Sequence, residues 1–311
     1  CNFSCVYCYQ NKNEKLMTTE VANMIIEKID RILNDNIFEG INIHYFGGEP
    51  LLNIPVLIYL DENIKKITDK IGIVYKAFLT TNGSMLSKEL LQKVKFSSIQ
   101  LTFDGLEKTH DRLRVSDHFH FKEEIELIEN IMNFSQAKVL LRTNICKENK
   151  DEIIALHKYI FEKFGNERIE INPNRTIKYH QDDSFEMLSV QECAEVAYQI
   201  KLLWSEQKGK FELPVPRSTP CKFPYGNAYA ISPEGYCTFC SGSMDQEKKY
   251  FFDVDIENKK MFSVRKECKK CNILPLCLGG CIIQYNLRAG ACTYEKYELK
   301  NILISYIKHI S

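Results

Sequence analysis

Thirteen cysteines in 311 residues constrain the fold of this chain more than any other feature of its sequence. Except for Cys146 and Cys193, they gather in one group at the start of the chain and another in its last third. No apolar signal segment is present and the spacings are tight, so a secreted disulfide framework explains them poorly. The pattern favours metal or iron–sulfur ligation in a reducing compartment, and we expect a cytoplasmic protein.

Charge and hydropathy exclude two classes of partner. The 41 Lys and Arg residues balance 41 Asp and Glu residues, and the isoelectric point is near 7.1. This balance gives no electrostatic reason to expect nucleic acid or an anionic membrane as a partner. The longest uncharged stretch, residues 271–287, is broken by proline and glycine and is too short to span a bilayer. We therefore expect a soluble protein.

Helical patterns alternate with short apolar runs through the first two thirds of the chain, as in repeated βα units. The first helix is expected after Thr18 or Thr19, either of which can cap it. A later helix is expected after Ser189, which forms a capping box with Glu192. The runs expected to be strands are residues 41–46, 73–80, 98–103, 138–143 and 168–172. They predict an α/β fold with a parallel sheet, open or closed into a barrel.

Polar and glycine residues follow these strands closely. Loops at the carboxyl ends of parallel strands meet around one point, so this rim usually carries binding and chemistry. The residues expected at this mouth are Gly47, Gly48, Asn82, Thr102, Asp104, Arg142 and Asn144. The helical pattern stops after Trp204 and three prolines follow, which predicts a boundary near residue 210. We expect one domain over residues 1–210 and a second, cysteine-rich domain over residues 211–311.

The opening sequence CNFSCVYC places Cys1, Cys5 and Cys8 with three and two residues between them. Three cysteines at such spacings, in a loop before a helix, can ligate three irons of a [4Fe–4S] cluster and leave the fourth iron open. The open iron can bind a substrate or cofactor directly. On spacing alone, a zinc site completed by a distant ligand is the alternative.

CNFSCVYC resembles the signature of radical S-adenosylmethionine (SAM) enzymes, in which an aromatic residue, here Tyr7, precedes the third cysteine. The sequence FGGEP at residues 46–50 is similar to that family's methionine-binding strand end, and LTFDG at residues 101–105 resembles a later strand. The resemblance implies a partial (β/α)6 barrel of TIM type. The family barrel begins with a strand before the first cysteine, so we expect this chain to be a cropped form.

The resemblance also implies roles for individual residues. Cys1, Cys5 and Cys8 would hold the catalytic [4Fe–4S] cluster, whose open iron chelates the amino and carboxylate groups of SAM. The other residues implied in SAM binding are Tyr7, Gly47, Gly48, Glu49, Asn82, Thr102, Asp104, Arg112 or Arg114, and Asn144. Asn82 could equally shape its own turn. An electron from the cluster would cleave SAM to a 5′-deoxyadenosyl radical, with flavodoxin or ferredoxin as electron donor.

The cysteines of the last third resemble the seven-cysteine SPASM domain, an extension of radical SAM enzymes that mature peptides and proteins. The resemblance implies an outer auxiliary [4Fe–4S] cluster, held by Cys268, Cys271, Cys277 and Cys292. It implies an inner auxiliary cluster, held by Cys221, Cys240 and Cys281. Two fully ligated clusters need eight thiolates, so Cys237 is an open candidate for the eighth.

The domain should also contain a β-hairpin over residues 228–239 and a C-terminal helix. In the hairpin, Gly235 supplies the positive φ that the turn needs. Cys193 is expected to be a packing residue. Cys146 is expected to be an ordinary half-buried cysteine, although peptide epimerases of this superfamily use such a thiol as hydrogen donor.

These features favour an enzyme that crosslinks a ribosomally made precursor peptide by a thioether or carbon–carbon bond. A sulfatase maturase and a peptide epimerase are alternatives within the family. The first is disfavoured because Ser241 stands where sulfatase maturases carry an Asp. A non-catalytic iron–sulfur electron carrier is the alternative outside the family, and the SAM-binding motif argues against it.

Overall fold

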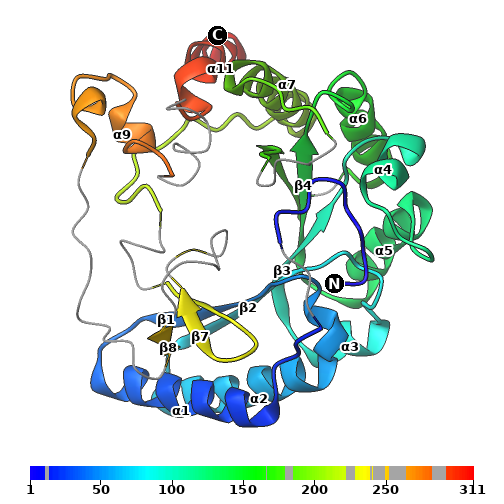
Figure 1. Ribbon diagram of the computed structural model, residues 1–311. Coiled ribbons are helices and arrows are strands. Elements are labelled where there is room, and N and C mark those ends of the chain that lie inside the picture. The colour runs from blue at the N-terminus through cyan, green and yellow to red at the C-terminus, as the bar shows by residue number, and fades with distance from the viewer. Residues whose placement is uncertain are drawn as a thin grey trace.

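A parallel sheet of five strands forms the centre of the protein (Figure 1). The computed structural model describes residues 1–10, 14–165, 167–178, 185–221, 228–238, 240, 249–251, 264–281 and 292–311. The strands lie side by side in chain order and are β1 (Gly40–Tyr45), β2 (Val74–Thr80), β3 (Phe96–Thr102), β4 (Lys138–Ile145) and β5 (Ile169–Arg175). The predicted α/β fold is confirmed, and each strand lies within a few residues of its predicted bounds.

Helices join the strands and cover the outer face of the curved sheet (Figure 1). They are α1 (Thr19–Asp35), η1 (Pro50–Asn53), α2 (Ile54–Ile71), α3 (Lys88–Lys93), α4 (Glu107–Leu113), α5 (Phe121–Phe134), α6 (Ile153–Phe164) and α7 (Val190–Lys208). Thr18 caps α1, and the predicted capping box of Ser189 and Glu192 begins α7. The inner face of the sheet is left free of these helices, as in part of a barrel.

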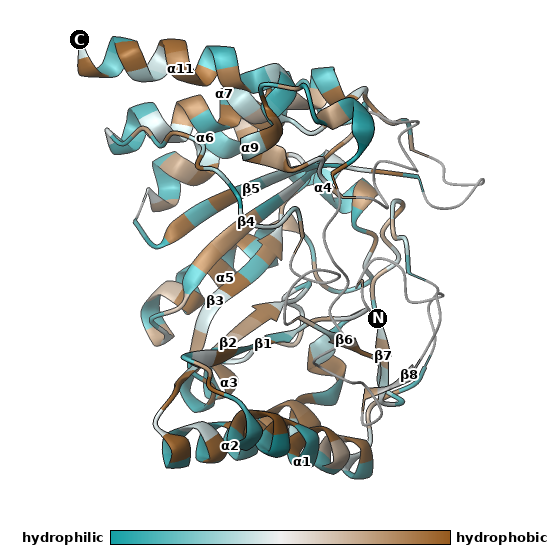
Figure 2. Ribbon diagram, turned by 90° about the vertical axis from the view of Figure 1, so that its left-hand side faces the viewer, coloured by the Kyte–Doolittle hydropathy of each residue, from teal (hydrophilic) through white to brown (hydrophobic). Residues whose placement is uncertain are grey.

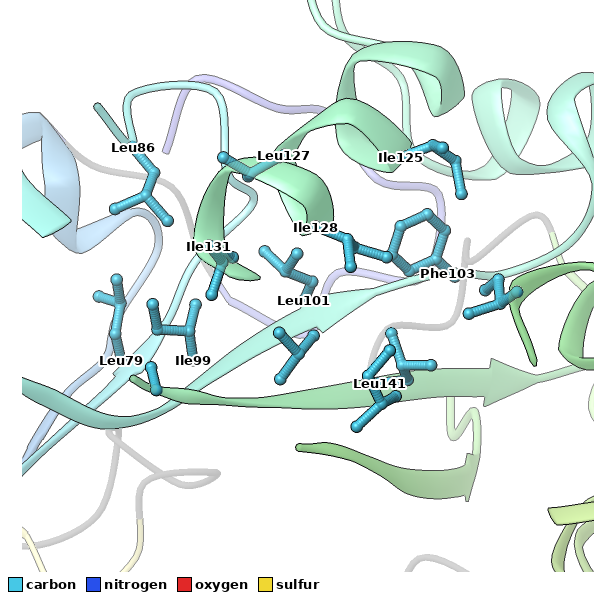
Figure 3. Close-up of a cluster of buried hydrophobic side chains, with 14 of the residues drawn as sticks. Leu79, Leu86, Ile99, Leu101, Phe103, Ile125, Leu127, Ile128, Ile131 and Leu141 are labelled. Atoms are coloured by element: carbon cyan, nitrogen blue, oxygen red, sulfur yellow. The ribbon is translucent and has the colours of Figure 1, made fainter. Parts of the chain in front are cut away.

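The main hydrophobic core fills the layer between the sheet and its helices (Figure 3). Ile99 and Leu101 of β3 and Leu141 of β4 are fully buried there with Ile128 and Ile131 of α5. Burying one such side chain stabilises the fold by about 1.5–3 kcal/mol. Because successive strand residues point to opposite faces, this core also decides which residues point to the inner face.

The cysteine-rich region contains a small antiparallel sheet. Its strands are β6 (Ala230–Ile231), β7 (Tyr236–Thr238) and β8 (Lys249–Tyr250). The first two form the predicted hairpin, in which Gly235 has a φ of 85°, and β8 adds a strand that the sequence did not predict. Cys237 and Phe251 pack with Ile25 and Ile29 of α1 in a second hydrophobic cluster. The hairpin therefore lies against the first helix.

The chain then returns to the helical layer. The elements that follow are η3 (Lys266–Cys268), α9 (Leu274–Cys277) and the predicted C-terminal helix, α11 (Glu295–Ile310). α11 packs along α7 (Figures 1 and 2), where the hydroxyls of Tyr198 and Ser305 lie 2.7 Å apart. α7 ends close to the predicted boundary near residue 210, and the division into two domains stays a prediction. No helix in the described ranges is long and apolar enough to cross a membrane.

Candidate active site

The opening cysteine loop, residues 1–10, is held against the end of α4 and the residues that follow it. The backbone N–H of Ser4 donates to the carbonyl of Val115 at 2.8 Å, and that of Val6 donates to Leu113 at 3.0 Å. The Phe3 ring is buried beneath the loop. A tight turn also brings the N–H of Cys8 to 3.1 Å from the carbonyl of Cys5. The three cysteines are therefore carried on a loop that is anchored to the fold.

The glycines after β1 meet this loop at both of its ends. The Gln10 side-chain amide donates to the carbonyl of Gly47 at 3.1 Å. A Cβ at position 48 would lie 3.0 Å from the Cβ of Cys1 and 3.1 Å from its nitrogen. Only glycine leaves room for that approach. The sequence could predict the two glycines at the mouth, and the structure shows that Gly48 contacts Cys1.

Asn82, after β2, contacts the same cysteine. Its side-chain nitrogen lies 3.9 Å from the sulfur of Cys1 and donates to the Asn2 side chain at 2.8 Å. Its side-chain oxygen accepts from the backbone of Ser84 at 3.0 Å, so it also shapes its own turn. A donor aimed at a sulfur and a glycine that admits the backbone fit a cluster-bound thiolate at Cys1.

Glu49 joins the ends of β1 and β2 from a buried position. One carboxylate oxygen accepts from the backbone of Leu51 at 3.0 Å and the hydroxyl of Thr81 at 2.7 Å. The other oxygen accepts from the backbone of Asn82 at 2.7 Å. Burial raises the pKa of Glu49, although these donors stabilise its charge. In this structure Glu49 positions the loops around Cys1, and its contact with SAM stays a prediction.

Tyr7 is tied to the ends of β3 and β4 through Asp104. The Tyr7 hydroxyl donates to one oxygen of the fully buried Asp104, whose other oxygen accepts from the backbone of Asn144 at 2.6 Å. The carbonyl of Asp104 accepts from the Asn149 side chain at 2.8 Å. Burial, followed by the charge of Asp104, raises the pKa of Tyr7 well above its ordinary value. Tyr7 therefore stays protonated, and as a hydrogen-bond donor it fixes the loop.

Arg114 is the buried arginine of the two that the sequence offered, whereas Arg112 is exposed. The Nε of Arg114 lies 4.0 Å from the carboxylate of Glu124, which also accepts from the backbone of Thr102 at 3.2 Å. Within the described structure this Nε has no hydrogen-bond partner. Burial opposes the charge of Arg114, but its acidic neighbours outweigh burial and raise its pKa. A guanidinium held in this way can receive a carboxylate.

Sequence reasoning missed Gln100, Asn172 and Asn174, which join the expected Arg142 and Asn144 in a row of polar side chains on the inner face of the sheet. Asn172 donates to Gln100 at 3.2 Å and accepts from Asn174 at 2.6 Å, while Arg142 donates to Asn144 at 2.9 Å. The alternation of polar and apolar residues in each strand indicated that these polar side chains share one face of the sheet. The alternation alone does not show which face is the inner one.

Three cysteines of the outer group lie around one turn. The sulfur of Cys268 lies 3.8 Å from the Arg265 guanidinium, and a Cβ on Gly279 would be 3.8 Å from it. The Gly279 N–H points at the sulfur of Cys277 at 3.4 Å. The ammonium of Lys296 lies 3.9 Å from the sulfur of Cys271. Donors aimed at each sulfur fit thiolate ligands. The grouping of Cys221, Cys240, Cys281 and Cys292 stays a prediction.

Three other thiols, those of Cys146, Cys193 and Cys237, are buried. Burial raises the pKa of Cys237 to about 11. Cys193 is fully buried in the main core, as expected of a packing residue. Cys146 is fully rather than half buried, and it packs with Leu113 and Phe185. None of the thirteen cysteines is in a disulfide, and no three metal-binding side chains among the described residues are arranged around a single ion.

Comparison with known families identifies the chain. The model of the radical SAM superfamily matches residues 1–160, slightly more than half of its 311 residues. The chain belongs to the radical SAM superfamily. Membership agrees with the anchored cysteine loop and supports SAM and a [4Fe–4S] cluster as its cofactors.

Two curated proteins resemble this radical SAM chain over part of their length. An uncharacterised protein of Methanocaldococcus jannaschii is 34% identical over 111 residues, which are 34% of this chain and 36% of that protein. The radical SAM cyclopropyl synthase TigE of Paramaledivibacter caminithermalis is 27% identical over 204 residues, which are 59% of this chain and 42% of that protein. The chain thus spans less than half the length of either relative.

Solved structures share the fold of this radical SAM chain. Native anSMEcpe with bound AdoMet, which is SAM, superposes with a TM-score of 0.74 at 16% identity, over 100% of this chain and 97% of that one. Streptococcus suis SuiB bound to SAM gives a TM-score of 0.58 at 16% identity, over 92% of this chain and 69% of that one. Likeness at these identities shows the fold alone.

Proposed function

We propose that this radical SAM chain modifies a ribosomally made precursor peptide by forming a crosslink. The observation that carries the proposal is the anchored loop of Cys1, Cys5 and Cys8, with Gly48 against Cys1, in a chain that also carries a second cysteine group. When bound, the cluster and SAM supply a 5′-deoxyadenosyl radical that abstracts hydrogen from the substrate.

In this proposal the residues of the mouth bind and orient SAM, and they exclude water from the site. Gly47, Gly48, Asn82 and Thr102 line the SAM site. The guanidinium of Arg114, whose buried Nε has no hydrogen-bond partner in the described structure, binds the SAM carboxylate. Tyr7 and Asp104 hold the loop in place, because their mutual bond joins it to the ends of β3 and β4. A rigid, closed site keeps a reactive radical from water.

The inner face supports a peptide as substrate. Side-chain amides both donate and accept hydrogen bonds, as peptide groups do, and Gln100, Asn172 and Asn174 carry three of them. Similarity to a cyclopropyl synthase favours a carbon–carbon bond over a thioether. The electron donor would be a flavodoxin or ferredoxin, and the setting would be the cytoplasm.

The cysteine-rich region, residues 211–311, would hold the two auxiliary [4Fe–4S] clusters with seven thiolates. Cys268, Cys271, Cys277 and Cys292 would serve the outer cluster. The inner cluster would use the remaining three, Cys221, Cys240 and Cys281. We leave Cys237 out of this set because it is buried and packs against Ile25 and Ile29 of α1.

Anaerobic incubation of the reconstituted protein with SAM and dithionite tests the proposal. We expect 5′-deoxyadenosine from the wild-type protein and none from Cys5→Ala, while the matched variant Cys193→Ala, which changes a core thiol, stays active. Co-expression with a precursor peptide should then lower the peptide mass by two hydrogens. A wild-type protein that forms no 5′-deoxyadenosine would refute the catalytic proposal, and an unchanged peptide mass would refute crosslinking.

A further inference from the structure

The C-terminal helix α11 turns its glutamates toward the protein and several aliphatic residues toward solvent. Its glutamates are turned toward the rest of the protein, where Glu298 pairs with Lys201 at 2.6 Å and Glu295 pairs with Arg217 at 2.5 Å. Its aliphatic residues Ile307 and Ile310 are 58% and 63% exposed. Figure 2 shows α11 as the outermost helix, beyond α7, with hydrophobic residues along it. Such a surface is stabilised when another apolar surface covers it.

A groove of about 480 Å³ follows this exposed side of α11. Its lining is formed by Asn272, Ile273, Lys296, Leu299, Lys300, Leu303, Ile304 and Ile307. Leu299, Leu303 and Ile307 recur every four residues, so they form one stripe along the helix. This is the spacing with which one amphipathic helix receives another.

The charged residues that line the groove are all positive. Lys296 and Lys300 are its charged lining residues, and no acidic residue lines it in the described structure. Residues 264–281 and 292–311 together carry seven Lys or Arg and three Glu, whereas the whole chain is neutral. Two of those glutamates are paired on the inward side of α11. Lys296 lies 3.9 Å from the sulfur of Cys271, so Lys300 is the lysine of this lining that can meet an anionic partner.

We propose that this groove binds an acidic amphipathic helical segment of a polypeptide partner. The apolar side of the segment covers Leu303 and Ile307, and a carboxylate beside that apolar side meets Lys300. If the proposed function holds, that segment is the part of the precursor peptide outside the reacting residues. The groove then fixes the substrate by contacts away from the opening loop that carries Cys1.

A synthetic peptide tests the groove without knowledge of the natural partner. The probe is a fluorescein-labelled helix with leucines on one face and glutamates beside them, and its binding to the reconstituted enzyme is followed by fluorescence anisotropy. We expect Ile307→Asp to weaken binding about tenfold, because it removes apolar contact at an exposed position that the fold does not need. Lys300→Glu should weaken the glutamate probe severalfold and improve binding of the same probe with lysines in place of glutamates.

Lys308→Glu is the matched control, since Lys308 is exposed on the same helix but does not line the groove. It should leave the affinity within twofold. Failure of the glutamate probe to bind, or equal affinity in all variants, overturns the proposal. So does a concentration-dependent dimer that Ile307→Asp abolishes, because a second copy would then be the occupant. SAM cleavage without peptide is measured in parallel, so loss of the catalytic function is seen separately from loss of the groove.

Discussion

Gly48→Ala should damage the SAM site more than it damages the fold. The added Cβ would lie 3.0 Å from the Cβ of Cys1, 3.1 Å from its nitrogen and 3.4 Å from its Cα. These atoms belong to or adjoin the backbone, so they cannot rotate away as a side-chain tip can. The loop must move by a few tenths of an ångström, and overpacking of this kind costs about 1–3 kcal/mol.

The assay must separate this displacement from a general loss of stability. Gly209→Ala is the matched control, since Gly209 ends α7 with a φ of 61° and its Cβ would meet nothing within 4 Å. A left-handed alanine costs about 1–2 kcal/mol, so both variants should lower the melting temperature by several degrees. Only Gly48→Ala should weaken SAM affinity, by about tenfold or more, which corresponds to about 1.4 kcal/mol.

SAM binding is read by titration and by the change that SAM causes in the electron paramagnetic resonance spectrum of the reduced protein. The spectrum reports on the iron that SAM contacts, whatever other clusters the protein holds. If Gly48→Ala keeps the wild-type SAM affinity and the wild-type spectral change, then the closeness of Gly48 to Cys1 is not important for SAM binding.

Three further predictions concern the buried network, acid stability and the auxiliary cysteines. Tyr7→Phe leaves a buried oxygen of Asp104 without its donor and should lower the free energy of unfolding by about 1–3 kcal/mol, measured by denaturant titration; no change would mean that the bond does not hold the loop. Burial lowers the pKa of His157 to about 3, so the folded state keeps this histidine neutral. Its contribution to stability is present above the unfolded pKa of about 6.5 and is lost by about 1.4 kcal/mol per unit as pH falls toward 3. His157→Gln cannot titrate, so its melting temperature should fall less steeply with acid than that of the wild type, and parallel curves would contradict this. Cys237→Val should keep the wild-type iron content whereas Cys240→Ala should lose iron, and iron loss in Cys237→Val would make Cys237 a ligand.

The sequence predicted the sheet well because each strand carries its own signal. Buried alternate residues such as Ile99 and Leu101 mark β3 regardless of what surrounds it. β8 was missed because a two-residue strand exists only through its pairing with β7. A short stretch of sequence does not show such pairing. Elements whose cause lies in their own residues were therefore predicted, and elements that depend on a distant partner strand were not.

The site was predictable in its members and less so in their contacts. The sequence placed Asp104 at the mouth. It could not show that the two oxygens of this carboxylate accept hydrogen bonds from the Tyr7 hydroxyl and the Asn144 backbone. It could not choose between Arg112 and Arg114, because the choice depends on how the chain leaves α4 toward Glu124. Both outcomes depend on residues far apart in sequence, which only the fold brings together.

The packing of α11 on α7 makes the cysteine-rich region a closed loop with both ends on one helix. It leaves from the end of α7 at Lys208 and returns where Lys201 and Tyr198 hold Glu298 and Ser305. A single protease cut between residues 211 and 221 would therefore not release the region, because α11 would still be packed on α7. The two fragments should travel together in native chromatography and separate only when the fold is lost.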